Sequence, residues 1–124
     1  MLTYLVIAVG GAVGSCLRYA LTELMTNLLG KAFPFGTLLV NILGSFVLGL
    51  LYAMISSGAV AAFPWRPLIA VGLLGAFTTF STFSLDTLLL LQQGEWLKAA
   101  ANIVLNVLLC LTFAWFGMKL GSMK

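Results

Sequence analysis

Ten consecutive residues just past the middle of the chain combine hydroxyl groups with evenly spaced aromatic rings. Residues 75–84 read GAFTTFSTFS, with five hydroxyl side chains among phenylalanines at positions 77, 80 and 83. Hydroxyl groups donate hydrogen bonds, and the edge of an aromatic ring carries partial positive charge. In a helical segment, rings spaced by three residues lie near one another. The stretch therefore predicts a path for a small anion, whose water shell is replaced by ring edges and polar donors.

The same stretch also predicts an interruption of a helix. Ser and Thr side chains clustered directly after Gly75 compete for the hydrogen bonds of a regular helix, so we expect irregular backbone over residues 75–79. At membrane depth such backbone is tolerated only where protein buries it or water reaches it, and its freed carbonyl groups can bind a cation. The alternative is an uninterrupted Ser/Thr-rich helix with a phenylalanine packing face.

Two other segments carry polar side chains at every fourth position, which places each set along one side of a helix. One set is Thr37, Asn41 and Ser45, and the other is Asn102, Asn106 and Cys110. Such sets often join helices through hydrogen bonds of about 0.6 kcal/mol each. Polar groups inside a membrane also mark aqueous paths, and two sets in so small a chain favour a path here.

The elements that must position these residues are membrane spans. The chain has 124 residues, of which 62% are hydrophobic and 7% charged, and its mean hydropathy is +1.15. A net charge of +3 is too small to indicate nucleic-acid binding. The chain has no histidine, and Cys16 and Cys110 are far apart, so zinc, iron–sulfur and Cys–His chemistry lack their ligands or base. We expect both cysteines to be buried small hydrophobic residues.

Turn residues divide the chain into four apolar runs, each long enough to cross a bilayer as a helix. We place the helices at about 2–29, 36–56, 68–91 and 96–118, joined by short loops within one transmembrane domain, 1–124. The first run lacks a basic n-region, and we interpret it as a retained helix. The fold class is an all-α membrane protein whose third helix is broken near its middle.

The basic residues are balanced across the two sides of this predicted bundle. With four spans, the N-terminus, the second loop and the C-terminus share one side. That side has Arg66, Lys119 and Lys124, and the other has Lys31 and Lys98, with Arg18 if its side chain reaches the first loop. Without an excess on one side, the positive-inside rule predicts both orientations and hence an antiparallel homodimer. The alternative is one orientation chosen by a marginal charge.

Arg18 is a single cation deep in the first span, on the same face as Gly10 and Gly14. A charge at such depth is costly, so we expect its side chain to bond a helix end or loop, or to face a water-filled vestibule. The two glycines predict close packing of helix backbones.

These residues occur together in a known family: the chain resembles the CrcB/Fluc fluoride channels over its whole length. The resemblance rests on the motifs GGAVG at 10–14 with RY at 18–19, GTLLVN at 36–41 with GSF at 44–46, and GAFTTFSTFS at 75–84. It implies an antiparallel dual-topology homodimer in the cell inner membrane, with two fluoride pores and a structural sodium ion on the two-fold axis.

The resemblance also implies roles for individual residues. Phe80 and Phe83 correspond to the pore phenylalanines, Asn41 to the amide that donates to fluoride, and the carbonyls of Gly75 and Thr78 to the sodium ligands. The remaining predicted pore donors are Thr37, Ser81, Thr82, Ser84 and Asn106. A β-branched residue at position 75 should crowd the bend and weaken the sodium site.

The last span departs from the family pattern, whose polar track there is mostly hydroxyl-bearing. Here the track is Asn102, Asn106 and Cys110. Asparagine amides donate as hydroxyls do, but a thiol is a weak donor, so we assign no fluoride contact to Cys110.

We therefore expect a passive fluoride-selective channel, and not an enzyme. The main alternative is a proton-coupled transporter of the small multidrug-resistance type, which needs a carboxylate in mid-membrane; Glu23 lies near the end of its span and Asp86 beyond the predicted break. An intramembrane hydrolase using Ser81 or Ser84 lacks a histidine or mid-membrane lysine as base. A non-transporting assembly subunit leaves the two polar sets unexplained.

Overall fold

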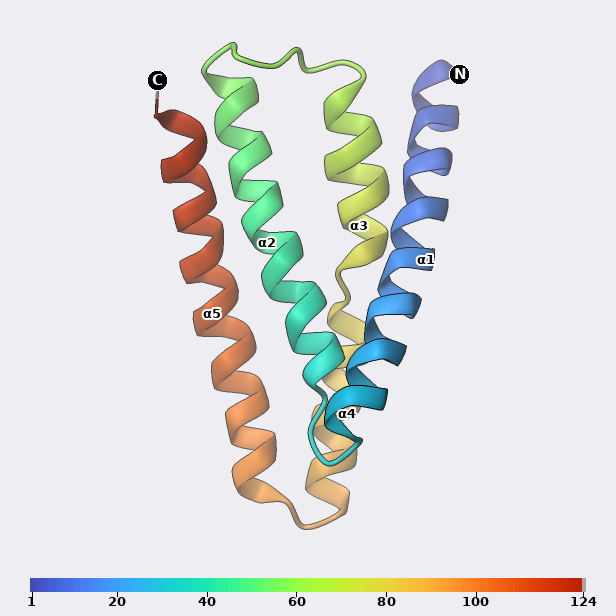
Figure 1. The fold of residues 1–124 in the computed structure, drawn as a ribbon, viewed down its shortest axis with the longest axis vertical. Coiled ribbons are helices and arrows are strands. Elements are labelled where there is room, and N and C mark those ends of the chain that lie inside the picture. Colours follow the sequence, from blue (N-terminus) through green and yellow to red (C-terminus); the bar gives the residue numbers. More distant parts are fainter. Residues whose placement is uncertain (124) are drawn as a thin grey trace.

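A computed structural model describes residues 1–123, so Lys124, counted above on the side of the termini, lies outside the described residues. Within them the regular structure is all helical, and four helical stretches are long and apolar enough to cross a membrane. The first, second and fourth are α1 (Leu2–Leu29), α2 (Phe35–Ser56) and α5 (Trp96–Ser122). Figure 1 shows the long helices side by side. The chain is thus built as a multi-pass membrane protein.

The third stretch is composite. It consists of η1 (Arg66–Leu73), which is a π-helix, followed by α3 (Leu74–Phe77) and α4 (Phe80–Gln92). The prediction began this helix at about 68 and included no π-helical turn. A π-helix is rare, and the hydrophobic pattern of the segment does not distinguish it from an α-helix.

Between α3 and α4 the backbone of Thr78 and Thr79 is extended, with φ/ψ of −86°/158° and −151°/119°. The prediction of irregular backbone over 75–79 is wrong for residues 75–77, which are helical. The reason is that both the N–H and the hydroxyl of Thr78 donate to the Leu74 carbonyl, each at 3.0 Å. These bonds complete the last turn of α3 before the chain leaves it.

Both termini lie at one end of the bundle, together with the long connection between α2 and η1 (Figure 1). The other two connections lie at the opposite end, as an even number of spans requires. Each of these two short turns contains a glycine with positive φ, Gly30 at 82° and Gly94 at 77°. Other residues rarely adopt this conformation, so the two glycines fix where α1 and α4 end.

Two pairs of helices pack backbone against backbone through glycine. In the pair α2 and α5, a Cβ atom added to Gly49 would collide with the Ala114 carbonyl. In the pair α1 and η1, a Cβ atom on Gly10 or Gly14 would collide with the backbone of Leu68 or Leu73. The predicted close packing at Gly10 and Gly14 is thereby confirmed.

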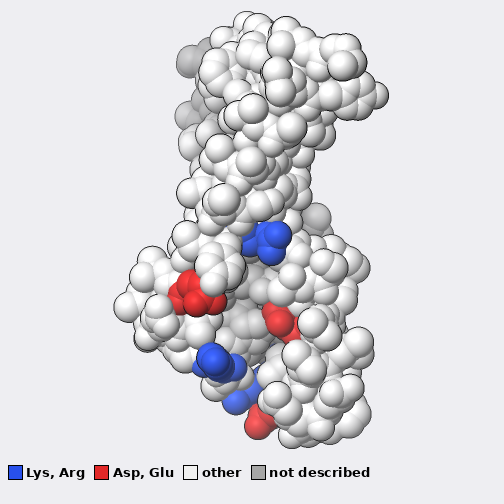
Figure 2. Space-filling view, turned by 90° about the vertical axis from the view of Figure 1, so that its right-hand side faces the viewer, with Lys and Arg blue, Asp and Glu red and all other residues white. Residues whose placement is uncertain are grey.

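Charged side chains are unevenly distributed along the bundle. Figure 2 shows one face on which they gather around a hollow in the lower half, while the upper half of that face is uncharged.

The cysteines do not follow the prediction of burial, because Cys16 is exposed and Cys110 is half-exposed in the single chain. Cys16 lies on α1 and Cys110 on α5, and in the single chain a large part of each helix surface is not covered by another helix. An apolar side chain on these helices can therefore remain exposed.

Candidate functional site

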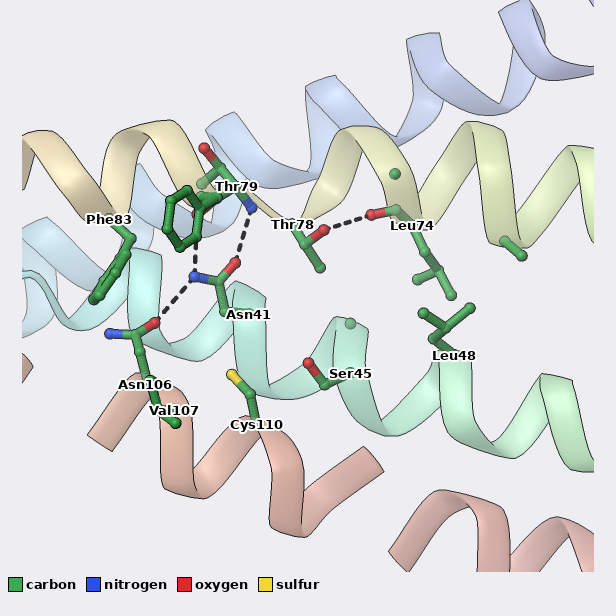
Figure 3. A pocket seen from close by; sticks show the side chains of 14 residues that line it. Asn41, Ser45, Leu48, Leu74, Thr78, Thr79, Phe83, Asn106, Val107 and Cys110 are labelled. Atoms are coloured by element: carbon green, nitrogen blue, oxygen red, sulfur yellow. Dashed lines mark hydrogen bonds between the residues drawn. The ribbon is translucent and has the colours of Figure 1, made fainter. Parts of the chain in front are cut away.

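A cavity of about 310 Å³ lies between α2, α5 and the junction of α3 with α4 (Figure 3). It brings together six of the predicted site residues: Asn41, Gly75, Thr78, Phe80, Phe83 and Asn106. Its other polar lining residues are Ser45, Thr79 and Cys110, and within residues 1–123 no Lys, Arg, Asp or Glu side chain lines it. Ser45 from α2 and Cys110 from α5 both line the cavity (Figure 3). The cavity is therefore polar in places but carries no fixed charge.

Two phenylalanine rings meet at this cavity. The ring centroids of Phe80 and Phe83 are 5.4 Å apart and the ring planes are inclined by 50°. Phe80 is 77% exposed in the single chain. The third ring, Phe77, does not join them as the spacing predicted, because the extended residues separate it from α4. It is buried instead, within reach of a Cβ atom built on Gly44.

The side chain of Asn41 holds the extended segment in place. Its Oδ1 accepts the Thr79 N–H at 2.8 Å, and its Nδ2 donates to the Thr79 carbonyl at 3.2 Å. A second hydrogen of Nδ2 is donated to Oδ1 of Asn106 at 3.0 Å (Figure 3). One amide thus satisfies both backbone groups of Thr79, which a helix would otherwise have paired.

Asn106 uses its own hydrogens within α5. Its Nδ2 donates to the backbone carbonyl and to Oδ1 of Asn102, at 2.8 and 3.0 Å. Because an amide nitrogen carries two hydrogens, Asn106 offers no free donor to the cavity in this structure. Asn102, which the site prediction did not include, is fully buried.

The carbonyl groups around the extended segment fall into two classes. The Ala76 carbonyl accepts a hydrogen bond from Nε of Arg18 at 2.9 Å, which confirms that Arg18 bonds a helix end. Within residues 1–123, the carbonyls of Gly75 and Thr78 accept no hydrogen bond. Both residues line the cavity, and their carbonyl oxygens are without a hydrogen-bond donor among the described residues.

Position 75 itself is open. A Cβ atom on Gly75 would meet only the Ala70 carbonyl, at an ordinary 3.8 Å, and Gly75 is exposed in the single chain. The expectation that a β-branched residue there crowds the bend therefore finds no support within one chain, because any crowding has to come from a neighbouring molecule.

Thr37 lies elsewhere. Its hydroxyl donates to Oδ2 of Asp86 at 2.8 Å, and both residues line a second cavity of about 230 Å³ near the connection of α1 to α2. Thr22, Lys31 and Gln93 also line this cavity. The structure therefore places Thr37 apart from the phenylalanine pair, in a charged and polar environment.

The remaining predicted donors line neither of these two cavities. The Thr79 hydroxyl caps α4 by accepting the Thr82 N–H at 3.2 Å, and it donates to the Thr82 hydroxyl at 3.1 Å. The Ser84 hydroxyl donates to the Phe80 carbonyl at 3.0 Å, and Ser81 is exposed. These hydroxyls lie at the start of α4.

Comparison with known proteins gives consistent matches over almost the whole chain. A family model described as "CrcB-like protein, Camphor Resistance (CrcB)" matches residues 5–118. The fluoride-specific ion channel FluC of Pseudoalteromonas translucida is 56% identical over 118 residues, covering 95% of this chain and 98% of that protein. The protein of the same name from Aeromonas salmonicida is 54% identical over 124 residues, covering 100% of this chain and 99% of that protein.

Proposed function

This chain belongs to the CrcB-like family, and from that premise we propose that it forms a passive, fluoride-selective ion channel that releases fluoride from the cell across the inner membrane. The observation that carries the proposal is the uncharged cavity in which the Phe80 and Phe83 rings lie with the Asn41 amide. The names of its full-length relatives, fluoride-specific ion channels, support the same ion.

The chemistry of the cavity suits conduction of a strongly hydrated anion. Conduction requires binding strong enough to replace water and weak enough to release the ion. The positive edges of Phe80 and Phe83 supply scattered partial charges in place of a fixed cation. Asn41 supplies an amide hydrogen, and the one it shares with the Thr79 carbonyl at 3.2 Å is the longer of its two bonds. Fluoride accepts a hydrogen bond from this hydrogen in place of the Thr79 carbonyl. Ser81 and Thr82 provide further hydroxyl donors on α4, whereas the Ser84 hydroxyl already donates to the Phe80 carbonyl.

A passive pore is sufficient for export. Hydrogen fluoride crosses membranes as a neutral molecule and ionises at cytoplasmic pH. A membrane potential that is negative inside then drives the anion outwards with about 2.3 kcal/mol per elementary charge for each 100 mV. The channel needs no coupled proton or nucleotide.

The assembly proposed is an antiparallel homodimer with two pores, formed by chains inserted in both orientations. The balance of Lys and Arg between the two ends supports dual insertion. The first cavity and the Phe80 ring are open in the single chain, which leaves a surface for a second copy.

The interruption of the third span at Thr78 and Thr79 is the centre of this assembly. We place a structural sodium ion at the two-fold axis, held by the unpaired carbonyls of Gly75 and Thr78 from each copy. Unsatisfied buried carbonyls cost on the order of 1–3 kcal/mol each, and a cation removes that cost. The neighbouring Ala76 carbonyl already accepts a hydrogen bond from Arg18, so we do not count it among the sodium ligands.

A proton-coupled multidrug transporter is not supported. Glu23 is exposed on α1, and Asp86 is bonded to Thr37 outside the cavity of the phenylalanine pair. The relatives' names indicate an ion channel and not an enzyme.

The direct test is fluoride efflux from liposomes that contain only the purified protein. A channel releases fluoride down its gradient without a proton gradient or a cationic drug. Efflux that requires either of these would support the transporter, and no efflux from a folded, reconstituted protein would refute both.

A further inference from the structure

A continuous series of hydrogen bonds runs from the Phe83 carbonyl to the Thr79 N–H. These two backbone groups lie at the two ends of the first turn of α4, and the series between them passes through side chains of α5 and α2. It starts where the Thr87 hydroxyl donates to the Phe83 carbonyl at 2.8 Å and accepts from Nδ2 of Asn102 at 2.9 Å. It continues through Asn106 to Asn41 by two bonds of 3.0 Å, and ends where Asn41 accepts the Thr79 N–H at 2.8 Å. We call the four side chains of Thr87, Asn102, Asn106 and Asn41, with the backbone groups of Phe83 and Thr79 at the two ends, the amide relay.

The relay has a single polarity because backbone groups fix both of its ends. The Phe83 carbonyl can only accept, so the Thr87 hydroxyl gives its hydrogen there and can only accept from Asn102. Along the series from Thr87 to Thr79, each amide must then present its nitrogen back toward Thr87 and its oxygen forward toward Thr79. At the other end the Thr79 N–H can only donate, and it requires the oxygen of Asn41. Both ends therefore select the same orientation of every amide.

The relay is shielded from water where it joins α4 to α5. Asn102 has no exposed surface, Asn106 is 6% exposed and Thr87 is 7% exposed. No charged side chain takes part in it. Hydrogen bonds in such surroundings strengthen one another, and a buried donor left without its acceptor is costly. A break at one link is thus transmitted to the next.

From this geometry we propose that Thr87 and Asn102 are positioning residues for the pore. They act through Asn106 to hold the Asn41 amide with its nitrogen toward the cavity, and they clamp the turn of α4 that carries Phe80 and Phe83. The inference rests on the proposed function, in which Asn41 donates to fluoride. It assigns Asn106 to the relay, and not to direct contact with the ion.

Hydrogen exchange in the wild-type protein tests the relay without any substitution. The side-chain amide hydrogens of Asn102 and Asn106 should exchange slowly in the ¹⁵N-labelled protein. Asn27 provides the internal comparison, because it is exposed on α1. Exchange at Asn102 and Asn106 as fast as at Asn27 would overturn the relay.

Substitution of Thr87 tests the positioning role. Thr87→Val keeps the shape of the side chain but removes the acceptor for Asn102, and Thr87→Ser restores it. Fluoride efflux should fall by roughly fivefold to tenfold in Thr87→Val, the effect of losing one buried hydrogen bond, and should remain near the wild-type rate in Thr87→Ser. Thr26→Val is a matched control, because the Thr26 hydroxyl also donates to the carbonyl four residues earlier, at 2.9 Å, but lies outside the relay.

A spectroscopic measurement separates positioning from a loss of stability. The Asn41 side-chain amide resonance should shift in Thr87→Val and stay in place in Thr87→Ser and Thr26→Val. If Thr87→Val does not assemble, Thr87→Ala removes the same acceptor without a second methyl group. Wild-type efflux and an unmoved Asn41 resonance in an assembled variant would overturn the proposal. If the wild type itself conducts no fluoride, the proposed function fails, whereas exchange and resonance still test the relay.

Discussion

The two glycine-packed pairs of helices are held in different ways around their polar residues. Between α1 and η1, glycines bring backbone against backbone, and among the described residues Arg18 is the α1 side chain that forms a hydrogen bond to another helix, at the Ala76 carbonyl of α3. Between α2, α4 and α5, side chains of Asn41, Asn102 and Asn106 join the helices as well. Backbone contact gives rigid support, whereas amides can exchange partners. We therefore propose that the first region is a scaffold and that the second contains the pore.

The largest effect is expected from separating the scaffold helices. In Gly14→Val the side chain would collide with the Leu73 backbone, and overpacking of this kind costs roughly 1–3 kcal/mol or more. We expect loss of the folded dimer in size-exclusion chromatography. Gly11→Ala is the control, because its Cβ atom meets only the Gly72 carbonyl at 3.8 Å. Equal dimer yields from the two variants would show that α1 and η1 are not packed through backbone.

In the pore region, the phenylalanine rings should matter for conduction and not for assembly. Phe80→Ile and Phe83→Ile retain bulk but lose the positive ring edge. Fluoride efflux should fall by roughly fivefold or more, since each aromatic interaction is worth on the order of 1 kcal/mol. Phe113→Ile, whose ring packs near Phe46 on α2, is the control. Wild-type efflux in both pore variants would mean that the rings only pack.

The predictability of the two regions from sequence also differs. Apolar runs and glycine turns located the spans, with α1 at the predicted residues and α5 extending to Ser122 where the prediction ended at about 118. The spacing of Gly10 and Gly14 was enough to predict their packing, because helical periodicity places both on one face. These features depend on local pattern alone.

The amide relay could not be predicted in the same way. The polar spacing placed Asn102 and Asn106 on one side of a helix, but only the register of α5 against α2 and α4 decides which oxygen meets which donor. The position of the Phe77 ring relative to Phe80 and Phe83 likewise depends on where α3 ends. Thr78 closes the last turn of α3, and this puts Phe77 and Phe80 on different segments.

The sodium ion would lie where the scaffold joins the pore. Replacing sodium by a large organic cation on both sides should slow fluoride efflux severalfold without changing its preference over chloride, because the proposed ion would support both pores and contact neither path. Gly75→Val should weaken the dimer but not the single chain, since position 75 is open within one chain. Efflux that is unaffected after prolonged exchange of the cation would exclude a sodium site.

The smallest effect concerns orientation. Adding two lysines to the connection between α1 and α2 breaks the balance of Lys and Arg and should favour one orientation. Efflux from cells expressing this variant alone should fall by roughly twofold or more, as antiparallel partners become scarce. Labelling of single cysteines from both sides of the membrane measures the orientations directly. One-sided labelling of a loop position in the otherwise unchanged protein would contradict dual insertion.

The central claim is passive conduction of fluoride, and it is tested most directly by setting the voltage across liposomes. Potassium gradients with valinomycin impose potentials of either sign while the pH is equal on both sides. We predict that fluoride flux follows the imposed potential, reverses direction with its sign, and greatly exceeds chloride flux at the same potential. Fluoride flux that ignores the potential, or that appears only with a proton gradient, would contradict the account.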